Sequence, residues 1–245
     1  VSGIGRVPPP SGDLKFTKSA NAGLDWSDPV TMDDTANVGL YTSIVAVDSS
    51  TLFASYYDAT NGDLKVAKST NGGSTWTLVK VDDTGDVGLY TSIAAVDSST
   101  VFVSYYDATN ADLKFAKAVS GGDVAVEWTT ISTVDSAGDV GQYSSIAAPE
   151  ESTVFIAYYD ATAVNRDLKS VTSTDGGATF GTPVTVESQG DVGQYVSLAN
   201  ILTHTLFVSY YDASTSKQDL RFARSLLLVD LEGHRVSAQY AMNPT

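Results

Sequence analysis

Two stretches of the sequence, one after the other, decide the fold. Residues 39–69 read GLYTSIVAVDSSTLFASYYDATNGDLKVAKS and residues 88–118 read GLYTSIAAVDSSTVFVSYYDATNADLKFAKA, which are identical at 25 of 31 positions. The tyrosine near the start of this unit recurs at Tyr41, Tyr90, Tyr143 and Tyr195, at intervals of 49, 53 and 52 residues. Self-similarity at a period of about 50 residues is typical of proteins built from structural repeats.

Each unit has the pattern of four short β-strands joined by turns. In the second copy, residues 92–96 are small and apolar, residues 101–106 are apolar and aromatic, and residues 113–117 alternate apolar and charged side chains. A fourth strand is expected at 76–81 in the first copy. Four strands per unit, separated by Gly, Asn and Asp turns, predict an all-β fold of the β-propeller type, in which each unit is one blade.

The termini bear on the number of blades. We expect one propeller domain over 1–245, with repeat units at about 13–40, 41–89, 90–142, 143–194 and 195–245. The tail 225–243 aligns loosely with 92–110, so it would supply the first two strands of a fifth blade that residues 13–32 complete. This alignment predicts five four-stranded blades, closed by joining the N- and C-terminal strands. In an alternative alignment, residues 226–230 form the outer strand of the fourth blade.

Composition restricts the partners of the chain. It carries 14 Lys and Arg against 29 Asp and Glu, a formal net charge of −15, and no cysteine. This charge repels phosphate backbones, so nucleic acid is not expected as a partner, and no apolar stretch is long enough to insert into a membrane. Disulfides and thiolate chemistry are excluded. The abundance of Tyr, Ser, Thr, Asn and Asp resembles that of a secreted bacterial protein, so we expect an extracellular monomer, although no signal peptide is visible in this chain.

Short glycine-rich hairpins between the third and fourth strands carry a recognisable motif. Residues 173–180 read STDGGATF and residues 69–76 read STNGGSTW, with a partial match, SANAGLDW, at 19–26 and a degraded copy at 121–128. They resemble the Asp-box, S-x-D-x-G-x-T-W/F, of the bacterial neuraminidase repeat family of β-propellers. The resemblance implies that the box is a structural hairpin on the face away from the active centre.

The resemblance does not extend to the catalytic residues of sialidases. Sialidases of that family bind the substrate carboxylate with three arginines and use a tyrosine nucleophile paired with a glutamate, together with an aspartate acid/base. No Tyr–Glu pair is recognisable here, and the arginines do not occupy equivalent positions of different inner strands: Arg6, Arg166, Arg221, Arg224 and Arg235. The two histidines, His204 and His234, lie at unrelated repeat positions, so neither a histidine-based triad nor a zinc site is expected.

Two loops of each unit are expected on one face of the propeller, around the mouth of a central channel. The first loop reads N/D-V-G-L/Q-Y, and the second begins at YYDA. A tyrosine ring stacks on a sugar while its hydroxyl hydrogen-bonds, and a carboxylate accepts hydrogen bonds from hydroxyls or binds calcium. The candidate ligand-binding residues are Tyr41, Asp58, Asp86, Tyr90, Asp107, Asp139, Tyr143, Asp160, Asp191, Tyr195 and Asp212.

Among these candidates, Asp86, Asp139 and Asp191 are preferred because they should lie nearest the channel axis. They are also the candidate catalytic residues and the candidate calcium ligands, since three close carboxylates raise one another's pKa unless a cation lies between them. No other cofactor is expected. The same residue types have a structural alternative, because Asp-x-Gly is ordinary turn chemistry and paired tyrosines can pack between blades.

Near-identical copies favour a multivalent carbohydrate-binding module, since repetition of weak sites raises avidity. The expected partner is a glycan or another small polar ligand. Alternatives are a glycosidase-like hydrolase that uses paired aspartates at the channel mouth, and a scaffold with no small ligand. Uniform repeats favour binding, because an enzyme gives its two carboxylates different roles. The departures from uniformity include Gln142 and Gln194, which replace Leu40 and Leu89, and Arg166 in one enlarged loop.

Overall fold

The computed structural model describes residues 12–119, 128–201, 205–229 and 235–241 of the 245-residue chain. His204, His234 and most of the degraded Asp-box copy lie outside these residues. No helix of the described part is long and apolar enough to cross a membrane. The strands are β1 (Leu14–Phe16), β2 (Val30–Asp33), β3 (Val38–Ala46), β4 (Leu52–Asp58), β5 (Asp63–Ser69), β6 (Thr77–Asp82), β7 (Val87–Ala95), β8 (Thr100–Asp107), β9 (Asp112–Val119), β10 (Trp128–Asp135), β11 (Val140–Glu150), β12 (Thr153–Asp160), β13 (Asp167–Ser173), β14 (Val184–Glu187), β15 (Val192–Ile201), β16 (Thr205–Asp212), β17 (Asp219–Val229) and β18 (Arg235–Ala241).

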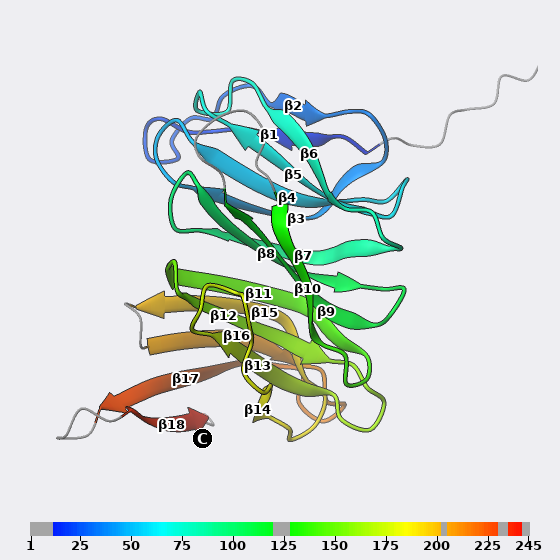
Figure 1. Ribbon diagram of the computed structural model, residues 1–245, viewed down its shortest axis with the longest axis vertical. Helices are drawn as coiled ribbons and strands as arrows, with labels where there is room; N and C mark the ends of the chain where they lie inside the picture. The colour runs from blue at the N-terminus through cyan, green and yellow to red at the C-terminus, as the bar shows by residue number, and fades with distance from the viewer. Residues whose placement is uncertain (1–11, 120–127, 202–204, 230–234, 242–245) are drawn as a thin grey trace, which may run out of the picture.

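These strands form four antiparallel sheets of four strands, each in chain order, as the repeat predicts. The sheets are β3–β6, β7–β10, β11–β14 and β15–β18, and a fifth sheet contains only β1 and β2. The first strands of successive sheets, β3, β7, β11 and β15, lie next to one another. Figure 1 shows the sheets following one another from β1–β2 at one end of the molecule to β17–β18 at the other. The all-β fold of four-stranded blades is therefore confirmed.

The expected closure by the terminal strands is wrong for the described residues. β18 pairs with β17, from Ala223↔Ala241 to Val229↔Arg235, and not with the N-terminal sheet. The alternative alignment is also wrong in detail, because residues 226–229 extend the third strand of the fourth blade and 235–241 form its outer strand. The physical reason is local: the long edge of β17 offers unpaired backbone groups, which the tail satisfies as a hairpin. The described chain has four complete blades and a two-stranded sheet.

Neighbouring blades are held together by a repeated contact between a leucine and a glycine. Leu113, on the third strand of one blade, is fully buried beneath Gly141 on the first strand of the next. Gly141 has φ of 105°, and a Cβ there would lie 2.6 Å from the Cα of Leu113, so only glycine allows this approach. The Val140 amide also donates a 3.0 Å hydrogen bond to the carbonyl of Ala111 in the preceding blade.

A buried charged network adds to three of these junctions. Tyr105 in β8 donates a 2.7 Å hydrogen bond to Asp82, which ends the outer strand of the preceding blade. Lys114 in β9 forms an ion pair with the same carboxylate. Equivalent groups recur at two further junctions, where Asp33 and Asp135 are the shared carboxylates. Because the polar groups are paired as they are buried, the blades can pack closely without unsatisfied charge.

Candidate functional site

Four tyrosines, one from the first strand of each complete blade, form a continuous row. They are Tyr41, Tyr90, Tyr143 and Tyr195, and we call them the tyrosine row. The ring centroids of successive members lie 4.6, 4.5 and 4.5 Å apart, with interplanar angles of 53°, 48° and 48°. The structure thus brings these four candidate residues into mutual contact along the line of first strands.

The backbone of every member of the tyrosine row is strained. The φ angles of the four tyrosines are 54°, 52°, 54° and 52°. A positive φ is unusual for a bulky side chain and costs roughly 1–3 kcal/mol at each position. Tyr90 also lies where the register between β7 and β8 shifts, between Leu89 and Ser92. Such strain is concentrated at functional sites, and here it recurs in all four copies.

The ends of the tyrosine row are open to solvent, whereas its centre is packed. Tyr195 is 66% exposed and Tyr41 is 41% exposed, while Tyr90 and Tyr143 are half-buried between their neighbours. Burial raises the pKa of Tyr90, and the neighbouring Tyr143 and Tyr41 raise it further. Tyr90 is therefore neutral at physiological pH and can both donate and accept hydrogen bonds.

A second tyrosine in each of the first three blades holds the aspartate that precedes the next member of the row. The hydroxyls of Tyr57, Tyr106 and Tyr159 donate 2.7 Å hydrogen bonds to Asp86, Asp139 and Asp191. Burial, followed by the hydrogen bond to Asp139, raises the pKa of Tyr106 to about 12. These three tyrosines were not among the candidate residues, although the doubled tyrosine of YYDA marks them in the sequence.

The aspartates differ in their remaining partners. Gln142 donates to Asp139 at 3.1 Å, and Gln194 donates to Asp191 at 3.3 Å. Arg166 adds an ion pair to Asp191 at 2.9 Å. Asp86 has no such glutamine, because Leu89 occupies the equivalent position three residues after it. The departures from repeat uniformity therefore act on the aspartates beside the tyrosine row.

The structure does not gather the three aspartates around one point. Each belongs to a different blade junction and is bound to its own tyrosine. Across the described ranges, no cluster of three or more His, Cys, Asp or Glu side chains is arranged to hold a metal ion. The geometry thus gives no common calcium site made of Asp86, Asp139 and Asp191.

The YYDA aspartates lie below the surface. All four are at most 2% exposed: Asp58, Asp107, Asp160 and Asp212. Asp107 accepts hydrogen bonds from the backbone amides of Thr109 and Asn110 and lies 3.9 Å from the ammonium group of Lys114. Asp212 is paired with Arg221 at 2.6 Å. In this position the carboxylates close a turn and neutralise a buried cation, which is the structural role of an Asx-turn.

Three further carboxylates near this end of the strands have raised pKa values. They are Asp63, Asp112 and Asp167, each the first residue of a third strand. Burial is the main cause, and for Asp112 and Asp167 the charge of the neighbouring YYDA aspartate comes next. Each of these residues begins the tripeptide D-L-K in the sequence, and none was among the candidate site residues.

Comparison with known proteins identifies the fold. No family model matches the sequence, and no curated protein matches it. The NanB sialidase from Streptococcus pneumoniae has a similar structure, with a TM-score of 0.57 and 14% identity over 85% of this chain and 34% of that one. The intramolecular trans-sialidase from Ruminococcus gnavus gives a TM-score of 0.51 and 15% identity over 95% and 49%. A PL25 ulvan lyase gives 0.51 and 14% over 77% and 53%.

These similarities establish a propeller architecture. The chain spans about a third to about half of the length of these three proteins. At identities this low, structural similarity does not transfer an activity, because one fold supports many unrelated functions. Membership of the Asp-box family stays a prediction from the motif.

Proposed function

We propose that this protein is a glycan-binding propeller module and that the tyrosine row is its binding surface. The observation that most supports this proposal is the strained backbone conformation shared by all four tyrosines of the row, two of which are well exposed. A row of aromatic faces suits an extended sugar chain, whose apolar C–H faces stack on the rings while its hydroxyls reach the tyrosine hydroxyls and Asp86. The similarity to propellers named as sialidases and a polysaccharide lyase supports a glycan as the ligand class.

Close packing of the four rings gives a reason for the protein to keep the strained backbone of the tyrosine row. Fixing the rings before binding reduces the entropy that is lost when a ligand is bound. The second tyrosines contribute to the same rigidity, since their rings lie 6.1–6.2 Å from the rings of the row. Repetition then allows one chain to contact several rings, so weak individual contacts add to a useful affinity.

A hydrolytic function is the second candidate, and the unequal surroundings of the aspartates favour it. Asp86 is exposed, whereas Asp191 is half-buried and paired with Arg166. Two carboxylates in different environments can act as acid and base when their separation suits the reaction. The binding proposal has the broader support, because it uses all four members of the row and not one pair of carboxylates.

Calorimetric titration of the purified protein with oligosaccharides selected on a glycan array tests the proposal, with and without added calcium. We expect saturable binding that Tyr195→Ala and Tyr41→Ala each weaken about tenfold, since both remove an exposed stacking surface. Asp86→Ala should weaken it less. Product analysis of the same mixtures by chromatography tests hydrolysis.

Ile131→Ala is the matched control. Ile131 is 42% exposed, close to the exposure of Tyr41, but it lies on the outer strand β10. Binding that is unchanged in Tyr195→Ala and Tyr41→Ala, or lost equally in Ile131→Ala, would contradict the proposed surface. Absence of any bound glycan across the array would overturn the function itself.

A further inference from the structure

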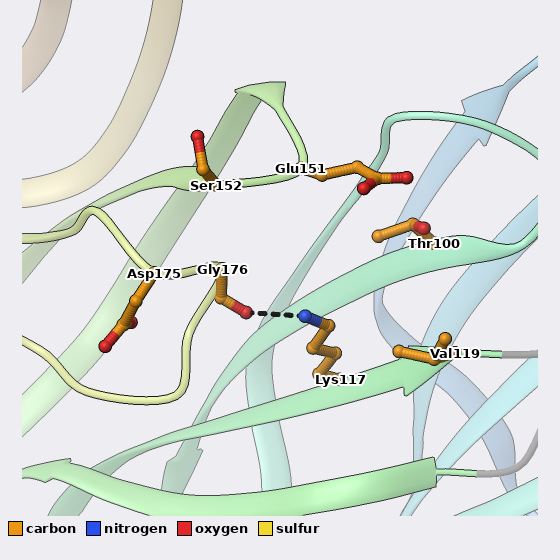
Figure 2. A pocket seen from close by; sticks show the side chains of 7 residues that line it. All are labelled: Thr100, Lys117, Val119, Glu151, Ser152, Asp175 and Gly176. Atoms are coloured by element: carbon orange, nitrogen blue, oxygen red, sulfur yellow. Dashed lines mark hydrogen bonds between the residues drawn. The ribbon is translucent and has the colours of Figure 1, made fainter.

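The Asp-box hairpin of one blade is received by the third strand of the preceding sheet. In the pair formed by the second and third blades, the ring of Phe115 fills the space beside Gly177, where a Cβ would lie 2.4 Å from it. Phe115 also contacts Phe180, the last residue of the box, edge to face with centroids 5.0 Å apart. The ammonium group of Lys117 donates a 2.9 Å hydrogen bond to the carbonyl of Gly176, at the edge of a small open cavity of about 370 Å³ (Figure 2).

The same contact occurs between the N-terminal sheet and the first blade. Phe16 in β1 fills the space beside Gly73 and packs edge to face on Trp76, with centroids 5.2 Å apart. Lys18 donates a 2.7 Å hydrogen bond to the carbonyl of Gly72. A phenylalanine and a cation two residues later thus form one half of the contact, and the Asp-box hairpin forms the other half.

The last blade carries the receiving half of this contact, and no hairpin from the described residues lies on it. Phe222 and Arg224 occupy on β17 the positions that Phe115 and Lys117 occupy on β9. Phe222 stacks on Phe207, with ring centroids 5.8 Å apart and an interplanar angle of 28°. Phe115 stacks on Phe102 in the same way, at 5.8 Å and 27°. However, Phe222 is 41% exposed, whereas Phe115 is fully buried.

The cation of this receiving half also lacks the partner that its counterparts have. The Nε of Arg224 is buried without a hydrogen-bond partner among the described residues. A carbonyl of an incoming hairpin would accept a hydrogen bond from the end of this side chain, as one does from Lys18 and Lys117 in the two contacts above. In the two internal contacts, that carbonyl belongs to the first of the two positive-φ residues in the Asp-box hairpin.

The N-terminal sheet carries the opposite half, a hairpin that none of the described strands receives. Residues 19–26 have the Asp-box geometry: the Gly23 amide donates to Ser19 at 2.8 Å, and the Asp25 amide donates to Asn21 at 2.9 Å. Ala22 and Gly23 have φ of 57° and 87°, close to the values of the two box glycines elsewhere. No atom of the described part of the chain lies within 4 Å of the Cβ position of Gly23, and Trp26 is 64% exposed.

The two free halves lie at opposite ends of the molecule, so one copy cannot join them while it keeps this arrangement (Figure 1). We propose that the last blade of one copy receives the 19–26 hairpin of a second copy. Phe222 then packs beside Gly23 and Trp26, and Arg224 donates to the carbonyl of Ala22. This contact is head to tail, so it generates a closed ring of copies or an open filament. The sequence predicts a monomer, and the proposal differs from that expectation.

Light scattering coupled to gel filtration, over a dilution series of the intact chain, tests the proposal. We expect a mass that increases with concentration to twice that of the chain or more. Trp26→Glu and Phe222→Glu should each raise the dissociation constant about tenfold or more, because each places a charge in an aromatic contact. A wild-type chain that stays monomeric throughout overturns the proposal and favours closure within one chain.

Mixing the two variants distinguishes this specific contact from nonspecific association. Trp26→Glu keeps an intact Phe222 face, and Phe222→Glu keeps an intact hairpin, so the mixture should form a dimer although each variant alone is monomeric. Failure of the mixture to dimerise, with both variants folded by circular dichroism, contradicts the pairing. Ile131→Glu, on an outer strand away from both halves, is the control that should assemble as the wild type does.

The proposal is independent of glycan binding. The contact uses the Asp-box end of the strands, whereas the tyrosine row lies at the opposite end, as the register of β12 and β13 from Asp160↔Asp167 to Val154↔Ser173 shows. Mass measurements without glycan therefore decide the assembly question, whatever the titrations decide about the ligand.

Discussion

The hydroxyl of Tyr106 donates a 2.7 Å hydrogen bond to Oδ1 of Asp139, and the two residues belong to different blades. Tyr106 comes from β8, and Asp139 lies in the turn that leads into β11. One bond therefore joins two blades and also orients a carboxylate beside the tyrosine row. The same arrangement at Tyr57 and Tyr159 makes the candidate surface part of the blade junction and not an addition to it.

Removing this hydroxyl should destabilise the junction. For Tyr106→Phe we expect a loss of about 1–2 kcal/mol in the free energy of unfolding, because the bond is to a charged group that is only partly buried. Urea denaturation followed by fluorescence measures it. Tyr211→Phe is the control, since Tyr211 also contacts the row but no carboxylate partner of its hydroxyl is found in the described part of the chain. Equal losses in both variants would contradict the role assigned to the Asp139 bond.

The buried ion pair between Lys114 and Asp82 should matter far more than an exposed one. The side chains of Lys114 and Asp82 are 11% and 2% exposed, so Lys114→Met leaves a buried carboxylate whose remaining partners do not neutralise it. We expect a loss of about 3–5 kcal/mol. Lys80→Met removes the half-exposed pair with Asp83 and should cost far less, because solvent screens that pair. Chemical denaturation of both variants gives the comparison, and a small loss in Lys114→Met would be the contrary result.

Acid should weaken the blade junctions in a defined pH range. Burial alone would raise the pKa of Asp33, but hydrogen bonds from Lys65 and Thr35 outweigh it and hold the pKa at about 2, below the ordinary 3.8. A lowered pKa in the folded state contributes stability above the unfolded value, and that stability is lost as the pH falls from 3.8 towards 2. The contribution of Asp33 is about 2 kcal/mol.

Asp82 and Asp135 have lowered pKa values for similar reasons and add to this loss. Thermal denaturation between pH 7 and pH 2 measures the effect. Measurements about 1 pH unit apart are close enough to resolve a pKa shift of this size. Asp33→Asn should be less stable than the wild type at neutral pH but should lose less on acidification, because one titrating group is absent. An equal acid slope in the two proteins would count against Asp33.

The glycine that contacts the leucine of the preceding blade should not tolerate a side chain. In Gly141→Ala the new Cβ meets the backbone of Leu113 at 2.6 Å and the residue must keep φ of 105°. We expect a loss of at least about 3 kcal/mol from the combined clash and strain. Gly181 has no positive φ, and its Cβ would meet only the Thr172 carbonyl at 3.4 Å, so Gly181→Ala is a mild control. Melting temperatures of the two variants that match would argue against the close contact.

The sequence by itself determined the repeat, the four-stranded blades and the approximate positions of the strands within a blade. It could do so because near-identical copies place the same alternation of apolar and polar residues, and the same turn glycines, at each blade. The strands expected at 101–106 and 113–117 lie within β8 and β9, and the one expected at 92–96 overlaps the C-terminal half of β7, which begins earlier, at Val87. Local pattern and backbone preference are enough to specify such elements.

Only the tertiary structure decided which residues meet between blades. The tyrosine row depends on the spacing of first strands, and the Tyr106–Asp139 bond joins residues 33 positions apart. The structure also decided which carboxylates are buried, as Asp107 is, and which are exposed, as Asp86 is. The pairing of the tail was equally undetermined, because an unpaired strand edge accepts any suitable partner, and proximity favoured the hairpin of β17 and β18.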